Sequence, residues 1–181
     1  MNEMPANLNG MLLQRSLRDS VRRLFMSKKK KSEEADYENR IKGIMYKIIH
    51  EGGQIIANNE LMSIPHIDKV NDDDYNLVCN LFLIGVFEEI GYRYENEFAR
   101  DPGGRHHLSP EQRSYIHFIH YSYVTKRDSF ENSRKIASEL REMRNDDLGY
   151  AIINSGSKAV REKSDMELTR VLSILQASRA S

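Results

Sequence analysis

The stretch from residue 92 to residue 108 constrains the fold more than any other part of the chain. Its aromatic residues stand at positions 92, 94 and 98, and this even spacing places them on one face of an extended strand. Residues 102–104 read Pro-Gly-Gly and supply turn chemistry, because proline fixes φ and glycine accepts a positive φ. The pattern predicts a β-hairpin with its second strand at 105–108. An isolated hairpin is marginal in water, so this one would have to pack on neighbouring helices.

Most of the remaining sequence has helical periodicity. Apolar residues from Leu13 to Leu24 recur at spacings of three and four, which predicts an amphipathic helix over about 10–26 and, after it, a solvated linker at Lys28–Lys31. Gly52 and Gly53 are expected to end a second helix that begins near residue 36. A short strand is expected at 54–56, followed by a brief helix that ends at Pro65.

The second half of the chain is predicted to be helical apart from the hairpin. Three aspartates at 72–74 mark a helix start, because carboxylates there accept hydrogen bonds from the unpaired backbone amides of the first turn. Ser109 with Gln112 forms a capping-box pattern for another helix. The expected helices cover about 72–90, 109–123, 129–144, 146–153 and 164–177, with a turn at 154–157.

The composition fits one hydrophobic core under a polar surface. Of 181 residues, 39% are hydrophobic and 30% are charged. No apolar run approaches the roughly 20 residues that a bilayer-spanning helix needs, and the beginning of the chain lacks the apolar segment of a secretory signal. The single cysteine, Cys79, excludes an internal disulfide and is expected to be buried as a small apolar residue. A cytoplasmic location is therefore expected.

The net charge of zero conceals a strong asymmetry along the chain. Residues 1–31 contain eight basic and two acidic residues, so the rest of the chain is acidic. A basic amphipathic helix can bind nucleic acid, an anionic membrane or an acidic partner. It can equally pack on the body of the protein or on a second copy of the chain.

The predicted order of elements over residues 36–108 is helix, short strand, short helix, longer helix and hairpin, and it resembles a winged helix-turn-helix domain. The segments 53–56 (Gly-Gln-Ile-Ile) and 87–92 (Phe-Glu-Glu-Ile-Gly-Tyr) carry part of the resemblance. Residues 100–105 followed by 107–109 are similar to the wing of MarR-type regulators. The resulting expectation is a mainly α protein with one short β-hairpin. It has a basic arm and linker (1–35), a winged-helix-like unit (36–108) and a helical C-terminal region packed on it (109–181).

This resemblance implies a non-catalytic DNA-binding regulator that uses the wing and the basic arm. The expected nucleic-acid-binding residues are Arg15, Arg18, Arg22, Arg23, Lys28, Lys29, Lys30, Arg100, Arg105, His106 and His107. Residues 60–101, however, contain ten acidic and three basic residues, a balance that repels phosphates. The alternative is therefore a protein-docking or inhibitor module on the same scaffold. The expected partner is DNA or a protein, and a homodimer is compatible with either function.

Two weaker patterns lie in the segment after the hairpin. Arg113 and His120, with Ser114, faintly resemble the arginine–histidine motif of HEPN-type ribonucleases, which makes RNA cleavage a minor alternative. His117 and His120 are three residues apart, a spacing that can serve a metal, but a polar-aromatic surface that also includes Tyr115 and Tyr121 is the preferred interpretation. No enzyme activity, cofactor or metal is expected.

Overall fold

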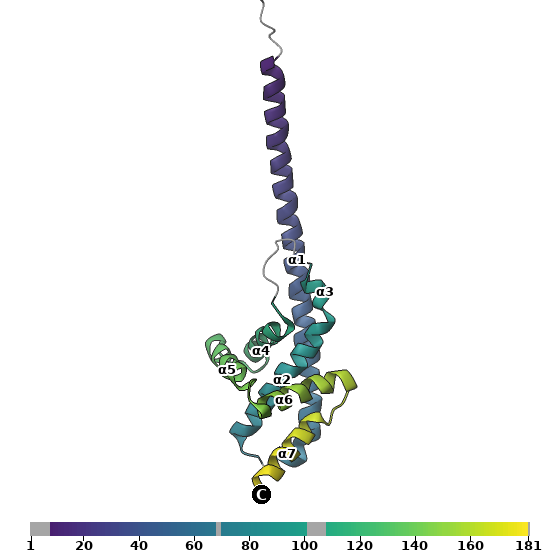
Figure 1. Ribbon diagram of the computed structural model, residues 1–181, viewed down its shortest axis with the longest axis vertical. Coiled ribbons are helices and arrows are strands. Elements are labelled where there is room, and N and C mark those ends of the chain that lie inside the picture. Colours follow the sequence, from purple (N-terminus) through teal and green to yellow (C-terminus); the bar gives the residue numbers. More distant parts are fainter. Residues whose placement is uncertain (1–7, 68–69, 101–107, 181) are drawn as a thin grey trace, which may run out of the picture. The chain divides into compact units, whose positions relative to one another are not determined.

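The computed structural model describes residues 8–67, 70–100 and 108–180, and every regular element in these ranges is a helix (Figure 1). The helices are α1 (Leu8–Ile67), α2 (Asp72–Arg93), α3 (Glu95–Phe98), α4 (Pro110–Thr125), α5 (Phe130–Met143), α6 (Asp147–Glu162) and α7 (Glu167–Ala180). The chain forms two compact units. Of the described residues, unit 1 comprises 8–41, and unit 2 comprises 42–67, 70–100 and 108–180.

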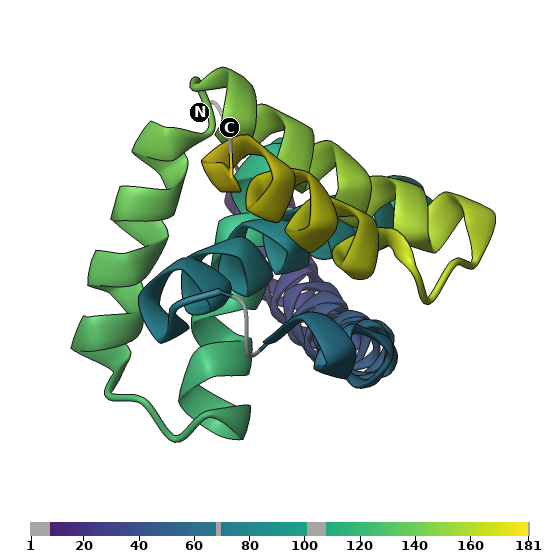
Figure 2. The ribbon, with the colours of Figure 1, turned by 90° about the horizontal axis from the view of Figure 1, so that it is seen from below.

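Helix α2 forms the centre of unit 2. All seven residues from Leu81 to Phe87 are buried, which in a helix requires neighbours on every side. Helices α4 and α6 both pack on α2. Figure 2 shows α4 and α5 on one side of α2, with α6 and α7 together on another.

Helices α2 and α6 cross with their backbones in direct contact. Gly85 on α2 faces Ile153, and Gly156 on α6 faces Phe82; a Cβ atom at either glycine would overlap the carbonyl oxygen opposite. The hydroxyl of Ser157 donates a hydrogen bond of 3.0 Å to the carbonyl of Gly85. The two glycines therefore set the separation of the central helix pair.

The part of α1 that belongs to unit 2 is held by a buried polar side chain. Asn59 is fully buried, and its amide nitrogen donates to the carbonyls of Ile55 (3.1 Å) and Ser164 (3.2 Å). Its oxygen accepts from the backbone amide of Leu168 at 3.2 Å. Asn59 thus satisfies backbone groups where α6 passes into α7, which joins α1 to the C-terminal helices.

The predicted β-hairpin is wrong for the residues that the structure describes. Tyr92 belongs to α2, and residues 95–98 form α3. The spacing of four between positions 94 and 98 also suits a helix, and Phe98 is buried against Arg113 of α4. The turn at 102–104 and most of the second strand, residues 105–107, lie outside the described residues.

The predicted interruptions of α1 are also wrong. Lys28–Lys31 are helical, as are Gly52, Gly53 and residues 54–56, and Pro65 lies inside the helix. Lys29 pairs with Glu33 one turn later, at 3.8 Å, so the lysine run carries its own helical ion pair. Gly52 is a packing position, because a Cβ there would overlap the ring of Phe87. The predicted turn at 154–157 is likewise part of α6.

Several helix boundaries are confirmed. Asn71 caps α2, accepting from the Asp74 amide at 2.9 Å, and the three aspartates occupy the first turn as expected. The capping box of Ser109 and Gln112 opens α4. Helix α5 and, with a shift of a few residues, α7 match their predicted ranges.

Candidate functional site

The candidate site of unit 2 is a surface groove between α4 and α5. The local sequence fixes both helix starts, since Ser109 caps α4 and Ser129 caps α5 by accepting from the Asn132 amide at 3.1 Å. The two helices pack on each other and enclose a groove of about 270 Å³. Its lining residues are Glu111, Gln112, Tyr115, Ile116 and Ile119 from α4, with Arg134, Ala137, Ser138 and Arg141 from α5. We call this feature the α4–α5 groove.

The floor of the α4–α5 groove is apolar and its rim is cationic. Tyr115 and Ala137 are buried, and Ile116 and Ile119 are half-buried. Arg134 and Arg141 are exposed. Among the described residues, neither arginine has a carboxylate within ion-pair distance. The groove therefore combines apolar surface with two available guanidinium groups.

The one carboxylate in the groove lining, Glu111, shares a guanidinium with a second carboxylate. Arg144 lies 2.8 Å from Glu88 and 3.5 Å from Glu111, and the Tyr115 hydroxyl lies beside the same guanidinium. Burial alone would lower the pKa of Arg144, but the hydrogen bond to Glu88 and the nearby carboxylates raise it above its usual range. Glu111 is therefore held beside Arg144, on which it and Glu88 both converge, and neither Arg134 nor Arg141 is its ion-pair partner.

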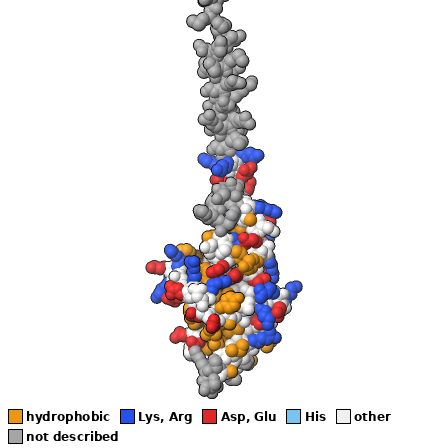
Figure 3. All heavy atoms as spheres, viewed as in Figure 1, with side chains coloured by type: hydrophobic (Ala, Val, Ile, Leu, Met, Phe, Trp, Pro, Cys, Tyr) orange, Lys and Arg blue, Asp and Glu red, His pale blue; other side chains and the backbone are white. Residues whose placement is uncertain are grey.

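An exposed apolar cluster lies at the turn that joins α4 to α5. Tyr123, Val124 and Phe130 are 53%, 61% and 49% exposed. The rings of Tyr123 and Phe130 meet edge to face, with centroids 6.3 Å apart and an interplanar angle of 86°. Tyr123 lies one turn beyond Ile119 on α4, so the cluster extends the floor of the groove along the helix. Figure 3 shows exposed apolar side chains among charged ones on the face it presents.

The residues predicted to contact nucleic acid are only partly placed by the structure. Arg15, Arg18, Arg22, Arg23 and Lys28 lie in the helical backbone of α1. Lys29 and Lys30 are exposed, and Lys29 pairs with Glu33. Arg100 lies 3.5 Å from Glu97, so its charge is balanced locally. Arg105, His106 and His107 lie outside the described residues.

The arginine of the ribonuclease-like pattern is enclosed in the structure. The Arg113 guanidinium donates to the Glu95 carboxylate and to the Leu108 carbonyl, and it lies over the Phe98 ring at 4.4 Å. Its side chain is 6% exposed, whereas His120 is half-buried. This arrangement supplies a structural ion pair and presents little of the guanidinium to a phosphate.

His117 is a buried core residue. It is 1% exposed and lies against the rings of Phe87 and Phe98, with centroid distances of 6.0 and 6.4 Å. Neither ring nitrogen has a hydrogen-bond partner among the described residues. Burial, with the nearby charge of Arg113, lowers its pKa to about 4. The expected polar-aromatic surface is therefore wrong for His117, as it is for Tyr115 and Tyr121, which are also buried.

Sequence reasoning missed the α4–α5 groove, although the sequence contains a signal for it. The apolar residues of α4 occupy more of its circumference than a single packing face needs: Phe118 and Tyr121 are buried, and Ile116, Ile119 and Tyr123 lie on another face. An apolar band of that width indicates a second neighbour or a binding surface.

Comparison with protein-family models, curated proteins and solved structures finds no match to this chain. None of the helices in the described part of the chain is long and apolar enough to cross a membrane. Within the same residues, no group of three or more His, Cys, Asp or Glu side chains is arranged to hold a metal ion.

Proposed function

We propose that the chain is a non-catalytic docking protein that binds a protein partner through the α4–α5 groove. The observation that carries the proposal is the combination, on one surface, of an apolar floor, an exposed aromatic pair and two arginines without carboxylate partners. Aromatic and arginine side chains dominate the binding energy of protein interfaces. Docking was the alternative for this sequence, as a module on the winged-helix scaffold; the present proposal rests on α4 and α5 and uses no residue of the predicted hairpin.

A matched pair of substitutions tests the docking surface. Ile119→Glu places a charge on the groove floor, and Ile174→Glu makes the same change at a 68% exposed site on α7. We expect Ile119→Glu to lower the amount of a specifically captured partner by about tenfold or more, because a buried unpaired charge is costly at an interface. The measurement is affinity capture from source cells, quantified by mass spectrometry, with circular dichroism to confirm folding.

Ile174→Glu should retain the partner at the level of the unchanged chain. If both substitutions reduce capture equally while the proteins remain folded, or if neither reduces it, the groove is not the docking surface. Light scattering of the purified chain determines whether the partner is a second copy.

We propose nucleic-acid binding by the basic N-terminal part of α1 as the second candidate function. The observation that favours it is that the helical backbone continues through the lysine run, so the eight cations of residues 1–31 lie on one helix instead of being divided by a linker. Continuous basic helices bind nucleic acids in several protein classes, and Lys29, Lys30 and Lys31 are exposed.

A salt titration tests this second candidate. If the lysine run contacts phosphates, affinity for duplex DNA should fall steeply between about 50 and 200 mM salt, and each contact contributes about 0.9 to the logarithmic slope. Replacing Lys28–Lys31 by glutamine should reduce the slope by up to about 4. The same replacement at Lys42 and Lys47, exposed lysines of α1 in unit 2, should leave the slope unchanged. A slope that is insensitive to the lysine run would exclude it as a phosphate-binding segment.

A further inference from the structure

We infer that the partner segment that enters the α4–α5 groove is an amphipathic helix with an acidic polar face; the inference rests on the proposed docking function. Two side-by-side helices with apolar residues between them form the type of groove that accepts a third helix. From Glu111 to Tyr123 the surface follows about 18 Å of α4, since each residue rises about 1.5 Å. That length matches about three turns of a partner helix, with apolar anchors at spacings of three and four residues.

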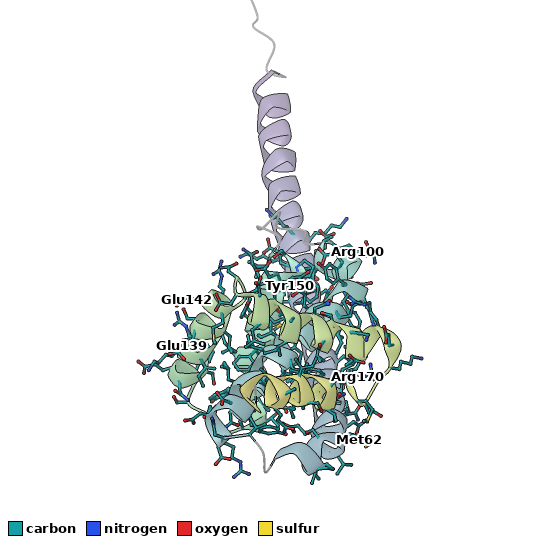
Figure 4. All side chains as sticks on the ribbon, turned by 60° about the horizontal axis from the view of Figure 1, so that its bottom comes forward. Met62, Arg100, Glu139, Glu142, Tyr150 and Arg170 are labelled. Atoms are coloured by element: carbon teal, nitrogen blue, oxygen red, sulfur yellow. The ribbon has the colours of Figure 1, made fainter. Side chains whose placement is uncertain are left out.

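The charged residues of the groove indicate which side chains the polar face of the partner helix carries. Arg134 and Arg141 are seven residues apart, which places them about two turns apart on the same side of α5. The acidic residues Glu139 and Glu142 do not line the groove, and Figure 4 shows them at the outer edge of α5. The charged side chains that line the groove are Arg134, Arg141 and Glu111, so the lining carries two positive charges and one negative charge. Arginine binds carboxylates with two parallel hydrogen bonds, so acidic side chains about two turns apart on the partner fit this rim.

The same features disfavour three other occupants: the basic segment of a second copy, a nucleic acid and a small ligand. The basic N-terminal segment of a second copy would bring arginine and lysine towards Arg134 and Arg141, and like charges at an interface are repulsive. A nucleic acid would use the arginines but would leave the half-buried isoleucines and the aromatic pair without apolar partners. A small ligand would have about 270 Å³ available, slightly less than typical ligand pockets.

A peptide selection from a random library tests the inference without knowledge of the partner. The library encodes helix-forming peptides in which all residue types are allowed at every varied position. The full chain is the bait. We expect the enriched peptides to carry apolar residues at helical spacing and an excess of Asp and Glu. The affinity of a selected peptide, measured by fluorescence anisotropy, should fall by about tenfold or more in the double variant Arg134→Glu/Arg141→Glu.

The control variant is Lys47→Glu/Lys135→Glu, which makes the same change in net charge at exposed lysines outside the groove lining. It should change the affinity by less than about twofold. Exchanging the acidic residues of the peptide for lysine should weaken binding to the unchanged chain and restore binding to the Arg134→Glu/Arg141→Glu variant. This rescue is the result that a general loss of stability would not produce.

The alternatives give distinct results. Enrichment of neutral or basic peptides that lose affinity with Ile119→Glu would overturn the acidic helix but keep the docking surface. Peptide binding that is unaffected by Ile119→Glu would overturn both. Dimerisation of the unchanged chain that is abolished by Ile119→Glu would assign the groove to a second copy and would also overturn the acidic-helix inference.

Discussion

Replacing Gly85 by alanine is expected to destabilise unit 2 by about 3 kcal/mol, the upper range for overpacking a core. The new Cβ would overlap the carbonyl oxygen of Ile153 and lie 2.8 Å from its carbonyl carbon and 3.0 Å from the Ser157 nitrogen. These are backbone atoms of α6, which cannot move aside as a flexible side chain can. The helices must therefore separate, which also breaks the hydrogen bond from Ser157 to the Gly85 carbonyl. Urea denaturation followed by circular dichroism measures the loss.

Gly91→Ala is the matched control, because it makes the same change on the same helix where a Cβ would meet nothing within 4 Å. Alanine favours helices over glycine by about 1 kcal/mol, so Gly91→Ala should be neutral or slightly stabilising. If the Gly85 and Gly91 variants have the same free energy of unfolding, the close contact between α2 and α6 is not what fixes the core.

The stability of unit 2 is expected to fall by roughly 3 kcal/mol as the pH is lowered from about 7 to about 4, through His117 alone. The pKa of His117 is about 4 in the folded chain, against an ordinary value of 6.5. Above pH 6.5 the imidazole is neutral in both states and contributes nothing to the pH dependence. Between 6.5 and about 4 the unfolded chain binds a proton that the folded chain does not, so acid favours unfolding. Below about 4 the loss is complete.

The substitution His117→Leu isolates this contribution. The carboxylates of the chain also titrate in acid, so the informative quantity is the difference between the two proteins in urea denaturation at about pH 7 and about pH 4.5. The leucine variant should lose much less stability over this interval. His50→Gln, at an exposed position of α1, should keep the original pH dependence because His117 is still present. Equal pH dependence in all three proteins would show that His117 is protonated as easily in the folded chain as in the unfolded one.

The sequence predicted the helices whose ends carry explicit capping residues. The aspartates at 72–74 and the Ser109–Gln112 capping box act within one turn of helix, so their effect is readable without tertiary structure. The roles predicted for two glycines were wrong because those roles depend on contacts with distant residues. Gly52 and Gly156 suggest a helix end and a turn by local preference, but each accommodates a distant group, the Phe87 ring and the Phe82 carbonyl respectively. Only the packed structure reveals that role.

The hairpin prediction failed because a spacing of four residues is compatible with one face of a strand and with one face of a helix. Tyr94 and Phe98 share one face of a strand and also adjoin along a helix. The burial of Phe98 under Arg113, which lies fifteen positions further along the chain, favours the helix. Long-range contacts of this kind cannot be inferred from a local pattern.

The candidate site was less predictable than the fold. Its residues come from two helices, and the sequence does not determine which face of α4 lies beside α5. Arg100, a cation of the expected wing, illustrates the same limit. It lies beside Glu97, and the sequence alone does not show that these two residues form an ion pair. The excess apolar surface of α4, at Ile116 and Ile119, is a signal in the sequence for the site, but it does not show which helix lies beside it.

We propose that the α4–α5 groove is the surface at which this protein binds its partner. The most direct test of this proposal is to follow the backbone amide signals of the full chain by NMR spectroscopy during titration with the tightest selected peptide. We expect the largest shifts between residues 111 and 141, on α4 and α5, and none of comparable size on α7. Shifts concentrated on α6 and α7 or in unit 1, with α4 and α5 unchanged, would contradict the account.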